Sequence, residues 1–257
     1  MSGYVAARRF AALLVLLLSV SGFTPAAFAQ FQVNVSVAFA SVPMSQALAV
    51  PEPFGLDAVP VNGGDVLTKW GGVVADIRAE GDILTRCRDA AQLCPAAAQK
   101  FLAVIADGRA HEGRARIGVI NRAINLAIRP TSDLAQWGVV DRWSAPLETL
   151  TSGRGDCEDY AIAKYVALTE AGVSEADVKL IIVRDLATGE DHAVVIARLD
   201  DKWIVLDNRR LTLLEDVEMP RVLPLFVLGY DGVKQFAPTA VANAAATKAP
   251  APSSLGF

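Results

Sequence analysis

The chain has 257 residues, 53% of them hydrophobic, so it is long enough to bury the core of one domain that carries short appendages. A net charge of −4 and an isoelectric point near 5.3 exclude a dominant basic surface, and nucleic acid is therefore not an expected partner. The composition therefore indicates a globular, acidic domain.

Residues 1–29 have the pattern of a signal peptide. Arg8 and Arg9 precede an apolar run from Phe10 to Val20, and Ala27-Phe28-Ala29 supplies small residues at a cleavage site. The run is shorter than the roughly 20 residues that span a bilayer, so cleavage is favoured over the alternative, an uncleaved membrane anchor. With either alternative, the domain that follows is predicted to be exported.

Export bears on the chain's three cysteines. Cys87 and Cys94 lie where a helix is expected to give way to a turn, close enough to form a disulfide; the alternative is two separately buried thiols. Cys157 is then the odd cysteine, which in an exported protein is either an inert buried thiol or a reactive one.

Three parts follow the signal peptide. Residues 30–62 contain scattered prolines and no sustained period, which indicates an extended arm or linker that leans on the domain. Residues 63–236 form the predicted domain. Residues 237–257 are rich in alanine and proline, which favours a disordered tail.

Helical periodicity precedes strand-like runs within the domain. Helices are predicted from Asp65, from Pro95, over Arg116–Arg129 and from Cys157 to Gly172. A loop is predicted for Trp137–Pro146, and Leu147–Gly155 leads into the Cys157 helix. Strands are predicted for Val178–Val183, His192–Leu199 and Lys202–Leu206, with further strand-like sequence around Leu223–Tyr230.

The turn between two predicted strands decides whether His192 and Asp207 can meet. If Asp200-Asp201 is a two-residue turn, Leu199 pairs with Lys202, and Asp207 lies opposite Val194. His192 then shares a face with Asp207 as its diagonal neighbour, at a backbone distance of roughly 7 to 8 Å that their side chains can close. A three-residue loop would put the two side chains on opposite faces.

Cys157, His192 and Asp207 form a candidate catalytic triad. Cys157 begins a helix, where the helix dipole and an adjacent imidazolium both favour the thiolate. His192 would act as the base and Asp207 would orient its ring, which is the arrangement of enzymes that transfer acyl groups from peptides or amides. Taken singly, a histidine at a strand start and an aspartate after a strand are more often structural residues. The backbone N–H of Cys157 is a candidate donor to the oxyanion.

Acidic residues surround the cysteine. Asp156, Glu158 and Asp159 suit the first turn of a helix, with Asp156 as N-cap, and capping alone would account for them. Yet carboxylates beside Cys157 should raise the pKa of its thiol and oppose the thiolate. A bound hard cation would resolve the conflict, and carboxylate oxygens are the ligands that calcium takes.

Two amides in the chain's clearest helical pattern are a further candidate. Asn121 and Asn125 flank the stripe formed by Ile117, Ile120 and Ile124. They either point towards an active site or are satisfied core amides, and the second interpretation is the commoner one.

The motifs Gly155-Asp156-Cys157-Glu158-Asp159-Tyr160-Ala161, Asp191-His192-Ala193-Val194 and Leu206-Asp207-Asn208 resemble those of the bacterial transglutaminase-like cysteine peptidases. This family includes the LapG-type periplasmic adhesin proteases. The resemblance runs from about Arg114 to about Tyr230. It implies an α+β fold with a papain-like and transglutaminase-like core, in which N-terminal helices and the nucleophile helix pack on an antiparallel sheet.

The resemblance also implies roles for the site residues. Cys157 becomes the nucleophile, His192 the base and Asp207 the orienting residue of a calcium-dependent cysteine endopeptidase, with Asp156, Glu158 and Asp159 as calcium ligands. The implied compartment is the periplasm, the implied substrate a large surface adhesin, and the implied regulator an inner-membrane receptor that responds to cyclic di-GMP. The segment before Arg114 and the tail have no counterpart in the resemblance.

Two other functions remain open from the sequence. The same acyl-enzyme can be resolved by an amine, so a transglutaminase or an amidase that acts on cell-wall peptide is an alternative. A non-catalytic peptide-binding module of the same fold is a second alternative. The reactivity of Cys157 towards an alkylating agent distinguishes this module from an enzyme.

Overall fold

The computed structural model describes residues 52–90 and 94–237. The signal peptide predicted for residues 1–29, most of the arm predicted for 30–62 and nearly all of the tail predicted for 237–257 lie outside these residues. Among the described helices, none combines the length and the apolar character that crossing a bilayer requires.

The helices come before most of the sheet in the chain. The predicted helices are confirmed, and α1 extends well past the apolar stripe that predicted it. The structure adds two short helices. Helix α4 lies before the predicted loop and meets it only at Trp137, and α5 lies mostly in the segment Leu147–Gly155 that leads into the Cys157 helix. The helices are α1 (Asp65–Asp89), α2 (Ala96–Arg109), α3 (Gly113–Ala127), α4 (Asp133–Trp137), α5 (Pro146–Ser152) and α6 (Cys157–Glu170).

Seven strands form one sheet in which every neighbouring pair is antiparallel, in the order β1-β9-β8-β4-β5-β6-β7. The predicted strands are confirmed, and an edge strand from residues 58–60 closes one side. A separate parallel pair, β2 (Arg129–Pro130) with β3 (Arg154–Gly155), lies among the helices. The strands of the large sheet are β1 (Ala58–Pro60), β4 (Val178–Asp185), β5 (Asp191–Leu199), β6 (Lys202–Leu206), β7 (Leu214–Glu215), β8 (Val222–Gly229) and β9 (Gly232–Phe236).

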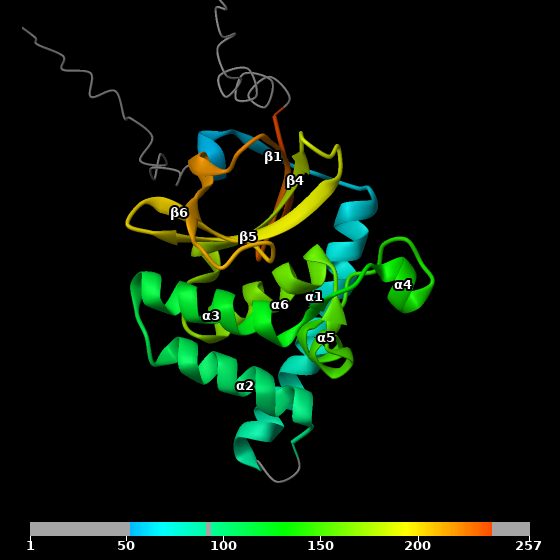
Figure 1. Ribbon diagram of the computed structural model, residues 1–257, viewed down its shortest axis with the longest axis vertical. Coiled ribbons are helices and arrows are strands. Elements are labelled where there is room, and N and C mark those ends of the chain that lie inside the picture. The colour runs from blue at the N-terminus through cyan, green and yellow to red at the C-terminus, as the bar shows by residue number, and fades with distance from the viewer. Residues whose placement is uncertain (1–51, 91–93, 238–257) are drawn as a thin grey trace, which may run out of the picture. The chain divides into compact units, whose positions relative to one another are not determined.

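Helix α6 is the central helix of the fold. It packs on β4 and β5, and α2 and α3 cover it from the other side, so that it lies between the sheet and the outer helices (Figure 1). Every residue from Asp159 to Leu168 is buried. A helix buried on all sides positions its first residue rigidly, and that residue is Cys157.

The strands are apolar on both faces because both faces are covered. On β4, Leu180 and Ile182 join the core shared with the helices, whereas Ile181 and Val183 join a second core on the opposite face. This alternation follows from the period of two along a strand. Leu56 belongs to the second core, so the part of the predicted arm that is described does lean on the domain.

The start of α5 is capped by another helix. Its N-cap residue is Ala145, which has no capping side chain, and Pro146 occupies the first turn. The backbone N–H groups of Leu147 and Glu148 donate instead to the carboxylate of Glu80 on α1, at 2.8 and 3.0 Å. Because the first N–H groups of a helix need partners, this tertiary contact explains a helix that local sequence did not predict.

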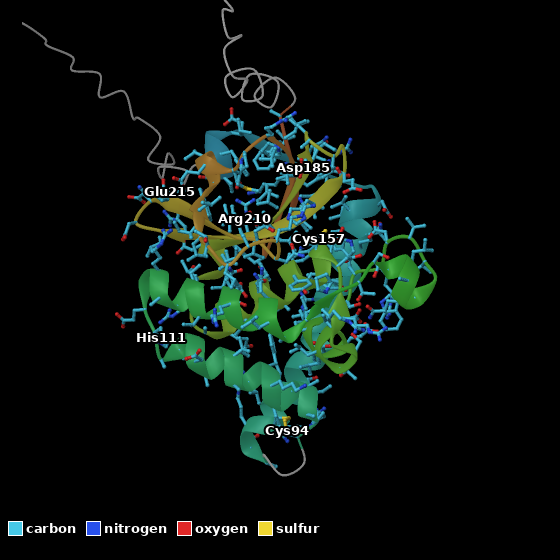
Figure 2. The ribbon with its side chains drawn as sticks, in the orientation of Figure 1. Cys94, His111, Cys157, Asp185, Arg210 and Glu215 are labelled. Atoms are coloured by element: carbon cyan, nitrogen blue, oxygen red, sulfur yellow. A yellow bond between two sulfur atoms is a disulfide. The ribbon has the colours of Figure 1, made fainter. Side chains whose placement is uncertain are left out.

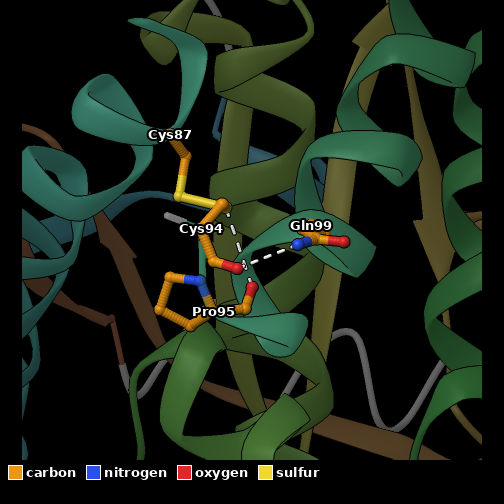
Figure 3. Close-up of a disulfide and its surroundings, with 4 residues drawn as sticks. All are labelled: Cys87, Cys94, Pro95 and Gln99. Atoms are coloured by element: carbon orange, nitrogen blue, oxygen red, sulfur yellow. Dashed lines mark hydrogen bonds between the residues drawn. A yellow bond between two sulfur atoms is a disulfide. The ribbon is translucent and has the colours of Figure 1, made fainter. Parts of the chain in front are cut away.

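Cys87 and Cys94 form a disulfide (Figure 3). It joins the last turn of α1 to Cys94, the residue before the N-cap Pro95 of α2, and the Gln99 side chain donates to the carbonyl of Cys94 at 2.8 Å. The prediction of a disulfide is therefore confirmed over that of two separate thiols. Cys157 is left as a free, partly buried thiol.

The β5–β6 hairpin has the predicted register. Leu199 pairs with Lys202 and Val195 with Leu206, across a two-residue turn in which Asp200 and Asp201 have φ values of 50° and 60°. Two consecutive residues at positive φ are typical of a type I′ turn, whose twist matches that of the strands.

Candidate active site

Cys157 is the first residue of α6 and is partly buried. Asp156 occupies the N-cap position, as predicted, but its side chain makes no capping hydrogen bond. The free N–H groups of the first turn therefore lie next to the thiol, where they favour a negative charge. Figure 2 shows Cys157 at the end of α6 that meets the sheet.

His192 and Asp207 meet across the β5–β6 hairpin. Nε2 of His192 lies 3.0 Å from Oδ1 of Asp207, and the two residues are only 3% and 2% exposed. Nδ1 of His192 is buried and has no partner within the described residues. A ring held at one nitrogen by a carboxylate and free at the other can take up and release a proton at the free nitrogen.

The turn after β6 holds the Asp207 carboxylate. Oδ1 also accepts the backbone N–H of Arg209 at 2.9 Å, and Nε of Arg210 lies 3.3 Å from Oδ2. Burial alone would raise the pKa of Asp207, but the hydrogen bond and charge of His192, with help from Arg209 and Arg210, bring it below the usual value. Asp207 is thus kept ionised although it is buried.

The side-chain amides of Asn121 and Asn125 on α3 bind the backbone of this same turn. Nδ2 of Asn125 donates to the carbonyl oxygens of Asp207 and Arg210 at 3.0 and 3.1 Å, and Nδ2 of Asn121 donates to the carbonyl of Arg210 at 3.3 Å. Of the two interpretations of these amides, the structure supports neither fully: they donate to the backbone around Asp207, and within the described residues no hydrogen bond joins them to Cys157. Their contribution is to hold the loop that carries the aspartate.

The thiol of Cys157 is paired with its neighbour in the sequence. Sγ donates to Oε2 of Glu158 at 3.0 Å and accepts a hydrogen bond from the backbone N–H of Ala193, the residue after His192. In the described chain, no hydrogen bond joins Sγ to His192. Burial, followed by the charge and hydrogen bond of Glu158, raises the pKa of Cys157 well above its ordinary value.

A cluster of carboxylates lies beside the thiol. Oxygens of Asp133, Asp156 and Asp159 fall within 4.8 Å of one another, an arrangement that could hold a cation. One buried oxygen of each carboxylate lacks a hydrogen-bond partner within the described residues. Carboxylates that converge in this way and keep an unpaired buried oxygen each fit a hard cation such as calcium.

Burial and mutual repulsion act on the same cluster. Burial, with the charge of Glu158 and a hydrogen bond to it, raises the pKa of Asp156 to about 9, and burial raises the pKa of Asp159 to about 7. Ser144 holds the other oxygen of Asp159 through its backbone N–H at 2.9 Å. At neutral pH the cluster therefore favours a positive ion, either protons or a metal.

The predicted ligand set and the observed cluster overlap in two residues. Asp156 and Asp159 belong to both, whereas the Glu158 carboxylate is engaged by the thiol of Cys157. Sequence reasoning missed Asp133, which no motif marks. The parallel β2–β3 pair, in which Pro130 lies opposite Gly155, brings Asp133 close to Asp156.

A thiol at the N-terminus of a buried helix, with a histidine–aspartate pair on the adjoining antiparallel sheet, defines the papain-like and transglutaminase-like class of cysteine enzymes. Residues 82–218, more than half of the chain, match the family model described as bacterial transglutaminase-like cysteine proteinase. The chain belongs to this family and is a cysteine peptidase.

Solved structures share the fold. Calcium-bound LapG of Legionella pneumophila is 21% identical, with a TM-score of 0.52 over 67% of this chain and 93% of that chain. The EGTA-treated form of the same protein is 21% identical, with a TM-score of 0.51 over 62% and 86% of the two chains. A further LapG structure from this organism is 19% identical, with a TM-score of 0.50 over 60% and 86%. A search of curated proteins finds no match.

Proposed function

We propose that this peptidase cleaves an exported protein with Cys157 as nucleophile, His192 as general acid and base, and Asp207 as orienting residue. The observation that carries the proposal is the buried contact of 3.0 Å between Nε2 of His192 and Oδ1 of Asp207. A buried histidine that is bound on one side only is suited to proton transfer on the other. Cys157 lies next to the strand that carries this histidine, because its sulfur accepts the N–H of Ala193.

The reaction consists of two acyl transfers. The Cys157 thiolate attacks the carbonyl carbon of the peptide, the C–N bond breaks, and the His192 imidazolium gives its proton to the departing amine. Water, deprotonated by His192, then attacks the thioester, which releases the new carboxyl group and the thiolate. The backbone N–H of Cys157 is the proposed donor to the oxyanion, because the first N–H groups of a helix have no intrahelical partner.

The thiol must leave Glu158 before it can react, since it is paired with that carboxylate at 3.0 Å. We propose that calcium binds Asp156 and Asp159 together with Asp133, and that Glu158 contributes to the same site. A bound cation supplies positive charge that offsets the carboxylates and so lowers the cost of a thiolate beside them. The calcium-bound LapG structure supports this choice of metal by similarity alone.

Export to the periplasm is part of the proposal, with residues 1–29 as a cleaved signal peptide and 63–236 as the peptidase domain. The Cys87–Cys94 disulfide supports it, because disulfides form and persist in oxidising compartments. The proposed substrate is a large surface adhesin. The proposed regulator is an inner-membrane receptor that responds to cyclic di-GMP. Both rest on the family resemblance.

The direct test compares the exported proteins of wild-type cells with those of a Cys157→Ala strain. We expect one large surface protein to lose a cleavage in the mutant and to regain it when purified wild-type protein is added with calcium. Chelation should abolish the effect of the added protein. If the cleavage pattern is the same in both strains, the substrate proposal is wrong.

The amine test separates peptidase from transglutaminase. A peptide substrate is incubated with the protein and a labelled primary amine, and the products are identified by mass spectrometry. Hydrolysis gives a free carboxyl terminus, whereas aminolysis leaves the label on the peptide. Predominant labelling would replace our assignment with the transglutaminase alternative.

A further inference from the structure

The Asp207 carboxylate lies on the turn that leaves the sheet after β6. One of its oxygens, Oδ1, receives two hydrogen bonds, from Nε2 of His192 at 3.0 Å and from the backbone N–H of Arg209 at 2.9 Å. The position of this oxygen therefore depends on where the turn places the backbone of Arg209. A shift of the turn would move the carboxylate relative to the ring of His192.

Two elements anchor this turn. Helix α3 anchors it through the two side-chain amides that donate to its carbonyl oxygens. Strand β4 anchors it through an ion pair, in which Nη1 of Arg209 lies 3.0 Å from Oδ2 of Asp185. Asp185 is the last residue of β4 and is labelled in Figure 2. This ion pair is called the Arg209–Asp185 bridge below.

The bridge spans the strand that carries the proposed base. Strand β5 lies between β4 and β6 in the sheet, so a contact from the end of β4 to the turn after β6 passes the first residues of β5. Arg184, which precedes Asp185, pairs with Asp191, which precedes His192. The bridge therefore lies at the level of His192 and joins the two strands that flank it.

Asp185 is itself held firmly by the turn between β4 and β5. Its Oδ1 accepts the backbone N–H of Ala187 at 2.8 Å, its own N–H donates to the carbonyl of Glu190 at 2.8 Å, and its carbonyl accepts the N–H of Gly189 at 2.8 Å. The two carboxylate oxygens thus have separate partners, since Oδ1 closes the β4–β5 turn and Oδ2 binds Arg209. Asp185 gives the guanidinium group a fixed point of attachment.

Stability alone does not account for the bridge. The side chains of Arg209 and Asp185 are 42% and 21% exposed, so water and salt screen the pair, and exposed ion pairs contribute little to the free energy of unfolding. A displacement of about 1 Å in a reacting group, in contrast, can cost about a hundredfold in rate. The larger effect expected from the bridge is therefore on the geometry of the site.

We propose that Arg209 and Asp185 are positioning residues. Their bridge fixes the turn after β6 and, through the backbone N–H of Arg209, holds Oδ1 of Asp207 in place for the ring of His192. The inference rests on the proposed roles of His192 and Asp207, whereas the hydrogen bond between these two residues can be tested without activity.

Asp185→Asn removes the bridge and keeps the β4–β5 turn. The amide oxygen still accepts the N–H of Ala187, whereas the amide nitrogen replaces Oδ2 and is a donor where Arg209 needs an acceptor. Asp177→Asn is the matched control. Asp177 accepts from Nε of Arg198 at 2.8 Å, its side chain is 28% exposed, and the pair lies at the opposite end of β5.

Asp185→Asn and Arg209→Met should each lower kcat for peptide hydrolysis by about tenfold and leave KM within about twofold, because proton transfer is affected and substrate binding is not. The melting temperature should change by no more than about 3 °C. The double variant should be no slower than either single variant, since both break one contact. Arg209→Lys, which keeps the charge, should be faster than Arg209→Met, and Asp177→Asn should match the wild type.

The second measurement needs no activity. In the Cys157→Ala protein with calcium present, NMR follows the ring proton that His192 donates to Asp207. The chain contains two histidines, and loss of the signal in His192→Gln assigns it. Exchange of this proton with solvent should become about tenfold faster when Asp185→Asn is added, because exchange requires the hydrogen bond to open. It should stay unchanged when Asp177→Asn is added.

The inference requires both effects, and either one without the other overturns it. Losses of kcat that multiply in the double variant would also overturn it, because the two residues would then act separately. If the wild type hydrolyses no peptide, the proposed function fails, and the exchange rates alone decide whether the bridge holds the hydrogen bond of Asp207. The two failures are therefore distinguishable.

Discussion

Gly155 and Asp159 are packed so closely that a β-carbon at position 155 would lie 2.5 Å from Oδ2 and 2.7 Å from Cβ of Asp159. Gly155 lies two residues before Cys157, and Asp159 lies two residues after it in the first turn of α6. The contact therefore links the entry of the helix to the carboxylate cluster. Glycine is needed here because a β-carbon would not fit, and not because of the backbone conformation, since Gly155 has no positive φ.

Gly155→Ala should displace Asp159, lower activity by at least about tenfold and destabilise the protein by roughly 1 to 3 kcal/mol, as overpacking usually does. The stabilisation by calcium should shrink as well. Gly81→Ala is the control, because a β-carbon there meets nothing within 4 Å and alanine is the better helix former. Thermal unfolding with and without calcium, together with peptide hydrolysis, checks both variants. Full activity of Gly155→Ala would contradict the prediction.

Asp207→Asn should lower kcat by about 10²- to 10⁴-fold, because the amide no longer favours the required ring tautomer of His192. Stability should change with pH in a defined direction. The folded state holds the pKa of Asp207 below its unfolded value, so its contribution is present above the unfolded pKa and is lost as pH falls through the folded pKa. Urea unfolding at several pH values should show wild type and variant converging in acid.

Lys164→Met should make the protein more stable. Burial lowers the pKa of Lys164 to about 7, so at and below neutral pH the folded state must hold a buried charge. The unfolded lysine keeps its proton up to about pH 10.4, so the free energy of unfolding of the wild type should rise between about pH 7 and 10. The variant should be more stable than the wild type by a few kcal/mol at pH 7, and this difference should shrink over the same range. Urea unfolding of wild type and variant across this range measures the difference. An equal or lower stability of the variant at neutral pH would contradict this.

Asp133→Asn should stabilise the calcium-free protein and reduce the gain in melting temperature on adding calcium. Burial raises the pKa of Asp133, which means that its charge opposes folding when no cation is bound. Asp65→Asn, which removes a surface acid of α1 paired with Lys69 at 2.7 Å, is the control. Calorimetry with calcium measures affinity directly. Unchanged calcium affinity in Asp133→Asn would remove Asp133 from the site.

Glu158→Gln should make the thiol of Cys157 more reactive in the absence of calcium. The charge of Glu158 and its hydrogen bond add to burial in raising the pKa of the thiol, so removing the charge lowers it. Alkylation with iodoacetamide near neutral pH should speed up by roughly threefold per pKa unit, because a less basic thiolate is also a weaker nucleophile. Glu148→Gln, which affects a surface pair with Arg142, is the control. Equal rates in wild type and Glu158→Gln would contradict the pairing.

The sequence predicts most of the large elements and the hairpin that joins His192 to Asp207. These features depend on local physics. The period of apolar residues marks the helices and strands, and the two-residue turn at Asp200-Asp201 sets the register, which places both side chains on one face. The disulfide likewise was predicted from the short separation of the two cysteines and from the export that the N-terminal residues predict.

The sequence by itself therefore determined which groups are reactive and on which helix, strand or turn each of them lies. Only the tertiary structure decided which carboxylates gather at Cys157, because Asp133 reaches Asp156 through strand pairing between segments distant in the chain. It also decided that Glu158 holds the thiol and that Lys164 is buried within reach of the charge of Asp207. Such contacts are set by the packing of α6 against the sheet and the outer helices, and no spacing along the chain encodes them.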